Sequence, residues 1–313
     1  MTVQQLEYVI AVDNYRHFAK AAEACYVTQP TLSMMIQKLE EELNVKIFDR
    51  AMHPVKPTVI GKTIIEQARV SLKYFNQIKE TVEAEQDLTK GSFSLGIIPT
   101  IAPYLVPELL KKQRDDMNDI ELRLKEATTA ILINNILTGT LDGGLLAGPI
   151  NHANLIEYPV YYEKFYAYVS KNDKLYNLNE IDLEKIDINS IWLLENVHCF
   201  RGQIERLCQM KKKSEEHFLS VKYEAGSIDT LMNIVDLNYG ITIIPELFAM
   251  GLGEEKQENL RPFKDTIAVR EVNLVVSKEY VRKTILNKVL EDIKSSIPKS
   301  MRDPKLREYV IDL

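Results

Sequence analysis

The 313-residue sequence has few cysteines and no long hydrophobic run. Its three cysteines, Cys25, Cys199 and Cys208, are too few for the disulfide framework of a small secreted domain. No stretch approaches the roughly 20 consecutive apolar residues that cross a bilayer. The first residues, MTVQQLEYVIAVDNYRHF, lack the basic start of a secretory signal and carry Glu7 and Asp13 within the apolar pattern. We therefore expect a cytoplasmic protein with no membrane partner.

The sequence also lacks the motifs of common enzyme classes. It contains no phosphate-binding loop, no nucleophile elbow and no dinucleotide fingerprint, so we expect neither an enzyme nor a bound cofactor. With 45% hydrophobic and 27% charged residues, the chain can bury a sizeable core, and its length predicts two or three domains. The net charge of −6 argues against broad nucleic-acid affinity but not against a local DNA-reading surface.

Residues 17–50, HFAKAAEACYVTQPTLSMMIQKLEEELNVKIFDR, predict two helices with a tight junction. Four small residues of the first helix allow the second helix to pack closely across it: Ala19, Ala21, Ala22 and Ala24. Thr28 is a suitable N-cap for the second helix, and Pro30 falls in its first turn, where no backbone N–H is needed. A buried stripe at helical spacing is predicted for Leu32, Ile36, Leu39 and Leu43. Cys25, beside the alanine-rich helix, is expected to be a buried and inert thiol.

The other side of the second helix has the hydrogen-bonding side chains of a major-groove reading helix. We expect the DNA-contacting residues to be Thr28, Gln29, Pro30, Thr31, Ser33, Met34, Gln37 and Lys38, together with Arg50. Residues 24–39 contain Lys38 and no acidic residue, so this surface does not repel phosphate. A plain helical hairpin with a solvated face remains an alternative.

The segment after Arg50, AMHPVKPT, predicts a β-wing. A long helix follows from Val59 to about residue 87, with one apolar side formed by Ile60, Ile64, Ala68, Leu72, Phe75, Ile78 and Val82. Such a helix is about 40 Å long and is expected to pack against a second copy, although it could also be a connector resting on its own chain. These patterns predict a winged helix-turn-helix domain at 1–58 and a dimerising linker helix at 59–88.

Residues 89–313 alternate between strand and helix patterns, which predicts an α/β domain with largely parallel sheets. The strands are predicted at 92–99, 120–127, 141–148, 156–170, 190–194, 220–225, 239–245 and 266–277. The helices are predicted at 103–117, 129–137, 200–212, 227–237 and 281–297. We expect two lobes, as in periplasmic binding proteins: lobe I at about 91–161 and 267–300, and lobe II at about 162–266.

Several polar residues begin predicted helices in this domain, namely Thr100, Thr128, Thr129 and Ser227. Each could be only an N-cap, which is the usual role of an isolated Ser or Thr at that position. Convergence of several helix starts on one cleft would favour a small polar or anionic ligand.

A winged helix-turn-helix, a linker helix and a two-lobed α/β domain together resemble the LysR-type transcriptional regulators, over essentially the whole chain. Within that family the segments GIIPTIAPYLVP (96–107), EATT (126–129) and GITIIP (240–245), with HC at 198–199, resemble the peroxide-sensing regulators. The resemblance implies that Cys199 is the peroxidatic cysteine and Cys208 the resolving one. It places Thr100, Thr129 and His198 at the peroxide site, with Arg270 as the arginine of the returning strand. It further implies operator DNA and RNA polymerase as partners, and a homodimer that pairs into a homotetramer.

The resemblance leaves two other functions open. The cleft could bind an organic effector, with the cysteines incidental. His198, Cys199, Cys208 and His217 could instead bind a metal, although their spacing differs from common zinc patterns. If residues 200–208 are helical, the two cysteines lie about 13 Å apart along the helix axis. A disulfide needs Cα atoms within about 4.4–6.8 Å, so its formation would require this segment to unwind.

Overall fold

The computed structural model describes residues 1–85, 90–115, 120–183, 186–187, 190–195, 199–207, 225–264 and 269–310. The chain forms two compact units, Met1–Leu88 with Leu137–Thr140, and Thr89–Ile136 with Leu141–Leu313. Among the described residues, no helix has the length and apolar character needed to cross a membrane.

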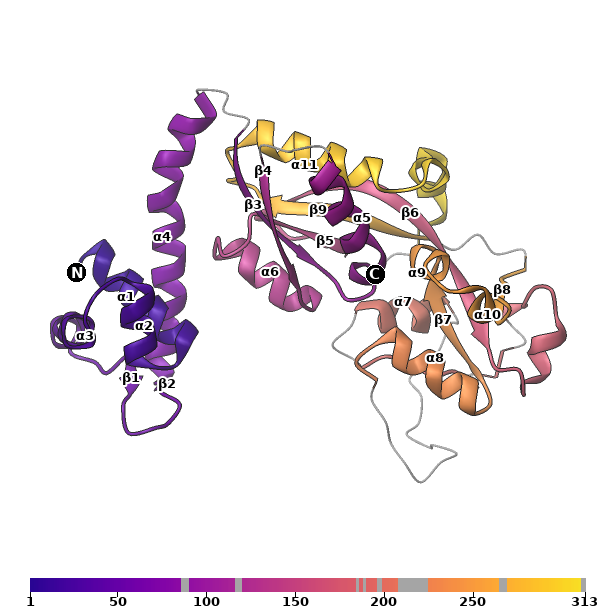
Figure 1. The fold of residues 1–313 in the computed structure, drawn as a ribbon, viewed down its shortest axis with the longest axis horizontal. Coiled ribbons are helices and arrows are strands. Elements are labelled where there is room, and N and C mark those ends of the chain that lie inside the picture. The colour runs from indigo at the N-terminus through magenta and orange to yellow at the C-terminus, as the bar shows by residue number, and fades with distance from the viewer. Residues whose placement is uncertain are drawn as a thin grey trace. The chain divides into compact units, whose positions relative to one another are not determined.

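The N-terminal unit is a helix-turn-helix followed by a two-stranded wing and a long helix (Figure 1). Its elements are α1 (Val3–Tyr15), α2 (Phe18–Ala24), α3 (Gln29–Leu43), β1 (Phe48–Asp49), β2 (Lys56–Pro57) and α4 (Val59–Glu85). The strands β1 and β2 pair in antiparallel fashion. The hydroxyl of Thr28 caps α3 by accepting from the Thr31 backbone N–H at 3.4 Å, and Pro30 lies in the first turn. Both local predictions are confirmed.

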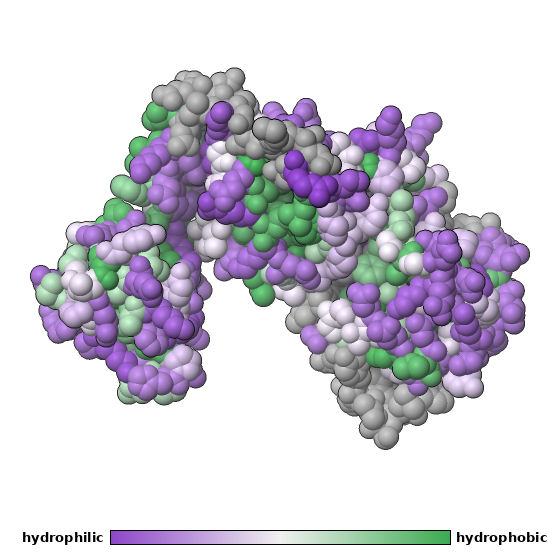
Figure 2. Space-filling view, viewed as in Figure 1, coloured by the Kyte–Doolittle hydropathy of each residue, from purple (hydrophilic) through white to green (hydrophobic). Residues whose placement is uncertain are grey.

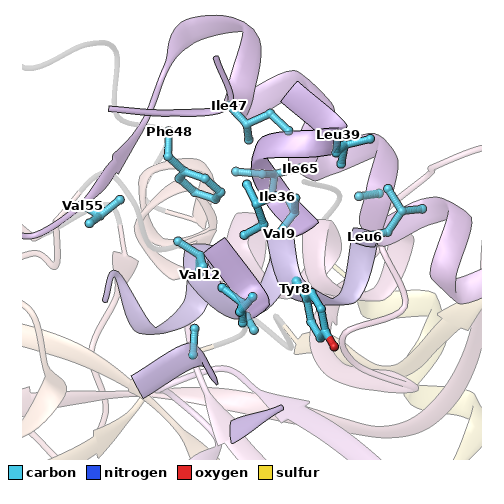
Figure 3. Close-up of a cluster of buried hydrophobic side chains, with 14 of the residues drawn as sticks. Leu6, Tyr8, Val9, Val12, Ile36, Leu39, Ile47, Phe48, Val55 and Ile65 are labelled. Carbon is cyan, nitrogen blue, oxygen red and sulfur yellow. The ribbon is translucent and has the colours of Figure 1, made fainter. Parts of the chain in front are cut away.

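The core of this unit lies between α3 and α1 (Figure 3). Leu32, Ile36 and Leu39 are fully buried, as predicted. Leu43, however, is 38% exposed, so the predicted stripe was one residue too long. The helix ends at Leu43, and Asn44 adopts a left-handed conformation that turns the chain away from the core. Of the four alanines, Ala21 and Ala22 are buried, whereas Ala19 and Ala24 are exposed.

The first half of α4 belongs to the same core. Ile65 and Ala68 are buried, and Ile64 and Leu72 pack against the cluster. Arg69 also forms an ion pair with Asp13 of α1 at 2.9 Å. The expectation that the whole apolar side of the linker is uncovered was therefore wrong for this half. The large apolar residues of α4 that stay exposed are Val59, Ile60, Tyr74, Phe75, Ile78 and Val82, and Figure 2 shows hydrophobic surface along this helix.

The first lobe of the second unit is built on three parallel strands, β3 (Gly91–Ile97), β4 (Ile120–Glu126) and β5 (Gly143–Gly148). Its helices are α5 (Ala102–Asp115), α6 (Thr129–Leu137) and α11 (Lys283–Ser295). A Cβ on Gly96 would lie 2.5 Å from Leu132 of α6, and one on Gly91 would lie 3.1 Å from Ile285 of α11. Successive residues of a strand point to opposite faces of the sheet, and residues 91 and 96 are an odd number of positions apart. Helices α6 and α11 therefore cover opposite faces of the sheet (Figure 1).

Two long strands connect the lobes. They are β6 (Leu155–Val169) and β9 (Val269–Ser277), in a seven-stranded sheet of order β4-β3-β5-β9-β6-β7 with β8 (Leu260–Pro262) beside β6. Residues 155–164 of β6 pair with β9, and residues 165–169 pair with β7 (Ile241–Pro245). All pairings of β6 and the β5–β9 pairing are antiparallel. The prediction of largely parallel sheets thus holds for β3, β4 and β5 but is wrong for these strands.

The second lobe carries α7 (Cys199–Leu207), α8 (Ile228–Leu237), α9 (Glu246–Met250) and α10 (Glu254–Gln257). The segment predicted as a strand at 190–194 forms only isolated bridges, from Ile191 to Ile241 and from Leu194 to Ala225. Of the strand predicted at 220–225, only Ala225 lies within the described residues. After α11 the short helices η4 (Lys299–Arg302) and η5 (Pro304–Tyr309) lead to Val310, which bridges to Val269.

Candidate functional site

The surface of α3 presents most of the predicted DNA-contacting residues to solvent. Exposed side chains are those of Thr28, Gln29, Pro30, Thr31, Met34, Gln37 and Lys38. Ser33 is half-buried, and its hydroxyl accepts from Arg50 Nη1 at 2.9 Å. Gln37 donates to Glu41 at 2.9 Å. Ser33 and Gln37 are therefore held in place before any ligand arrives.

A buried carboxylate that the sequence reasoning missed connects α3 to the wing. Glu40 is 2% exposed and accepts the backbone N–H groups of Ile47 at 2.8 Å and Phe48 at 3.3 Å. It also accepts from Arg50 Nη2 at 3.3 Å, while the Arg50 guanidinium lies 5.0 Å from the Phe18 ring centroid. Glu40 thus fixes the start of β1 relative to α3. It also holds the Arg50 side chain near the exposed side of α3. The sequence did contain a signal for this buried residue: Glu40 lies four residues after Ile36 and therefore on the apolar side of α3.

In the second unit, the structure brings together two residues that are 170 positions apart in the sequence. Arg270 on β9 donates from Nη1 to the Thr100 hydroxyl at 2.9 Å and from Nη2 to the Thr100 carbonyl at 3.4 Å. The Arg270 side chain is completely buried, and Thr100 is also buried. A guanidinium is always charged, so this site carries a fixed positive charge away from water.

The Arg270 charge is compensated by Glu163 on β6, which the sequence reasoning also missed. Glu163 is completely buried, and its Oε1 accepts from Arg270 Nε at 2.7 Å. Its Oε2 accepts from the Leu247 backbone N–H at 2.9 Å, and the Tyr161 hydroxyl donates to Oε1 at 3.4 Å. Burial, and secondarily the Glu163 charge, raise the pKa of Tyr161 well above its ordinary value, so its hydroxyl stays protonated as a donor. The available signals were the two glutamates in the largely apolar strand β6, Glu157 and Glu163, and the single arginine in β9.

Thr129 lies near the same edge of the sheet by topology. It is the buried first residue of α6, after the carboxyl end of β4. Thr100 follows the carboxyl end of β3, which pairs in parallel with β4. In open α/β sheets, ligand sites form at such strand ends. Ser227 has the plainer role: its hydroxyl caps α8 by accepting from the Thr230 N–H at 3.2 Å.

Helix α7 begins at Cys199 and continues to Leu207, so the predicted helix is confirmed up to that residue. His198, Cys208, His217 and the side chain of Cys199 lie outside what the structure describes. Gln203 of α7 is completely buried, and within the described part of the chain neither polar atom of its amide has a hydrogen-bond partner. A buried amide without a partner is costly and calls for an explanation, such as a role in binding or catalysis. Within the described residues, no three His, Cys, Asp or Glu side chains gather as metal ligands.

Similarity to known proteins extends over both units. Residues 86–296 match the LysR substrate binding domain family. Residues 3–62 match the bacterial regulatory helix-turn-helix proteins of the lysR family.

The similar proteins include several named for hydrogen peroxide. A hydrogen peroxide-inducible genes activator of Haemophilus influenzae is 33% identical over 257 residues, which cover 82% of this chain and 84% of that protein. The DNA-binding transcriptional dual regulator OxyR of Escherichia coli K12 is 32% identical over 247 residues, 79% of this chain and 80% of that protein. A solved structure of a full-length OxyR variant from Pseudomonas aeruginosa superposes with a TM-score of 0.76 at 29% identity, covering 94% of this chain and 98% of the other. The chain therefore belongs to the LysR family, a family of transcriptional regulators rather than of enzymes.

Proposed function

We propose that this LysR-family protein binds operator DNA and is switched by hydrogen peroxide through Cys199. The observation that carries the proposal is the buried hydrogen bond from Arg270 to the Thr100 hydroxyl. Two residues assigned to the peroxide site by resemblance alone are thereby in direct contact. The similarity to hydrogen peroxide-inducible genes activators, at 32–33% identity over about four fifths of the chain, supports the same conclusion.

In the proposed first step, the Cys199 thiolate attacks one peroxide oxygen. An S–O bond forms, the O–O bond breaks, and two electrons pass from sulfur to oxygen, giving a sulfenic acid and hydroxide. The leaving oxygen gains negative charge, which the Arg270 cation and the Thr100 hydroxyl would stabilise. Thr129 and His198 are proposed to orient peroxide, and His198 to assist protonation of the leaving hydroxide. The buried amide of Gln203, which has no hydrogen-bond partner among the described residues and lies on the same helix as Cys199, is a further candidate for this site.

In the second step, the Cys208 thiol attacks the sulfenic acid and releases water, giving a reversible disulfide. Helix α7 extends from Cys199 to Leu207, so the described part of the segment between the two cysteines is helical. The Cα atoms cannot come within disulfide range without unwinding α7. A Cβ added at Gly202 would meet no described atom within 4 Å, and the conformational freedom of glycine lowers the cost of unwinding. Oxidation would thereby change the shape of the second lobe.

On the DNA side, we propose a dimer that forms through the exposed residues of α4 and presents two reading helices. The module is not strongly basic, since residues 1–60 hold six Lys and Arg against seven Asp and Glu. Binding through two modules would compensate for the modest attraction of each. Pairing of dimers into a tetramer, contact with RNA polymerase and a cytoplasmic location complete the proposal.

Thiol counting combined with DNA footprinting tests this function. Peroxide should convert Cys199 and Cys208 to a disulfide, detected by mass spectrometry, and change the footprint. Cys199→Ser should abolish both responses, whereas Cys208→Ser should stop at the sulfenic acid or a more oxidised form. Cys25→Ser is the matched control and should respond normally. If both thiols survive peroxide with an unchanged footprint, the organic-effector function replaces this one.

A further inference from the structure

We propose that Glu163 is a positioning residue that holds Arg270 in register with Thr100 for the peroxide reaction. The inference rests on the proposed function, because it concerns how the same site is kept ready. The Glu163 carboxylate accepts from Arg270 Nε, whereas the Thr100 hydroxyl accepts from Nη1, so the two residues bind different nitrogens of the guanidinium. Its role is therefore to orient Arg270 and not to contact peroxide.

The pairing of Glu163 with Arg270 depends on an irregularity in β6. Pro159 pairs with Asn273, but Tyr161 and not Val160 pairs with Val272, so β6 contains one extra residue. After this bulge, Glu163 lies directly opposite Arg270. With regular pairing, Tyr162 would take that position, because a one-residue shift exchanges the two faces of a strand. The bulge thus places a carboxylate, and not a phenol, beside the guanidinium.

The carboxylate is itself held from two sides. Its Oε2 accepts from the Leu247 N–H of α9, and in return the Glu246 side chain accepts from the Lys164 N–H at 3.1 Å. These reciprocal bonds fix residues 163–164 against the start of α9. Because Oε1 binds Arg270 while Oε2 is fixed, the guanidinium has one favoured orientation, with Nη1 directed at Thr100. Removing the charge would leave a completely buried cation without its carboxylate.

The test uses full-length protein that also carries Cys25→Ser and Cys208→Ser, so that Cys199 is the reporting thiol. Two rate constants are measured by mass spectrometry, oxidation of Cys199 by hydrogen peroxide and alkylation by iodoacetamide. Glu163→Gln should lower the peroxide rate about 10- to 100-fold, the range typical of residues that orient a neighbouring functional group. The alkylation rate should stay within about twofold, because Arg270 is proposed to act on the departing peroxide oxygen. A general loss of structure would change both rates.

A double-mutant cycle with Arg270→Met separates positioning from an independent effect. If Glu163 acts through Arg270, then Glu163→Gln should have no further effect on the peroxide rate once Arg270 is replaced. Full additivity of the two losses would overturn the proposal. Glu163→Asp is a second variant that keeps the charge but is one methylene shorter, so it cannot reach both Arg270 and the Leu247 N–H. It should fold and still lose peroxide rate; an undiminished rate would also overturn the proposal.

Glu157→Gln is the matched control on the same strand. Glu157 accepts from the Ile150 N–H at 3.0 Å and from Asn273 Nδ2 at 2.8 Å, and it is not bonded to Arg270. This variant should keep the wild-type peroxide rate, and an equal loss in both variants would reduce Glu163 to a structural residue. If wild-type Cys199 does not react with peroxide at all, the proposed function fails. If wild type reacts and Glu163→Gln matches it, only the positioning role fails.

Discussion

Glu40 shows how one buried side chain can hold a small module together. Its carboxylate satisfies two backbone N–H groups where the chain enters the wing, at Ile47 and Phe48. Its charged partners contribute less, because Lys46 and Arg50 keep side-chain exposures of 69% and 37% and are screened by water. The stabilisation should therefore come mainly from the two backbone donors.

Replacing Glu40 by Ala should destabilise the N-terminal unit by about 2–4 kcal/mol, because two buried donors lose their acceptor. Hydrogen exchange of α3 amides in the full-length protein measures this local stability. The single tryptophan, Trp192, lies in the other unit, so its fluorescence should report little change. Glu42→Ala is the control: its exposed pair with the N-terminal amine should be worth less than about 1 kcal/mol. Equal effects of the two substitutions would contradict the assigned role of Glu40.

Cys25 offers a prediction about pH. Burial first, and the nearby Glu7 charge second, raise the pKa of its thiol above the ordinary value. The thiolate fraction at neutral pH should therefore be smaller than that of a free cysteine, and alkylation should be slow. In a Cys199→Ser/Cys208→Ser variant, the rate of iodoacetamide labelling should rise with pH and level off only above the ordinary cysteine pKa. Glu7→Gln should move that midpoint to lower pH. A midpoint below the ordinary value would show that Cys25 is an activated thiol.

At the scale of elements, the two halves of the linker helix differ in how far they are buried. Its first half completes the core of the DNA-binding unit through Ile65 and Ala68. Beyond Leu72 its large apolar side chains are about half exposed or more, from 45% for Phe75 to 64% for Ile78. An apolar strip of this kind is typical of an interface with a second helix.

Ile78→Asp should therefore weaken dimerisation about 100-fold or more, because two carboxylates would be buried close together without partners. Sedimentation should show monomers at micromolar concentration. Asn76→Asp adds the same charge two residues earlier, about 160° around the helix, and should remain dimeric. A dimer of unchanged affinity in Ile78→Asp would show that α4 is only a connector.

Local signals were enough to predict α2, α3 and α4 of the first unit, whereas α1 (Val3–Tyr15) was not predicted. Thr28 and Pro30 mark the start of α3, and the Leu32–Ile36–Leu39 spacing identifies its buried side, because capping and periodicity act within a few residues. The sheet of the second unit was harder, because a strand pattern carries no information on which strand pairs with it. The continuous strand β6 and its antiparallel partners depend on contacts between segments about 100 residues apart.

The residues of the candidate site also differ in how far local sequence could predict them. Thr100 and Thr129 were predictable from their positions at helix starts, and Arg270 only through a family resemblance. Glu163 was missed because its place opposite Arg270 depends on the bulge at Val160, which shifts the register of β6 by one residue. Glu40 was missed because it is the first of three consecutive acidic residues, Glu40 to Glu42. In a typical helix, all residues of such a run are exposed. Long-range pairing of buried charges was thus the part that sequence patterns could not supply.

At the scale of the whole molecule, an acidic chain must bind an acidic polymer. The net charge is −6. Among the predicted DNA-contacting residues, only Lys38 and Arg50 are positively charged. Arg50 is partly committed to Ser33 and Glu40. Each module should therefore displace few counterions, and a useful affinity should require two modules on one duplex.

This argument predicts that the salt dependence of operator binding follows the number of modules. If each module neutralises about three or four phosphates, the dimer should show a slope of log K against log salt of about −5 to −7, and the monomeric Ile78→Asp variant about half of that. Fluorescence anisotropy between about 50 and 200 mM KCl gives both slopes, with a half-site duplex for the monomer. Asn76→Asp, which carries the same added charge, should keep the steep slope of the dimer. Equal slopes for Ile78→Asp and Asn76→Asp would mean that one module makes all the phosphate contacts, and the dimer would then contribute through contacts other than charge.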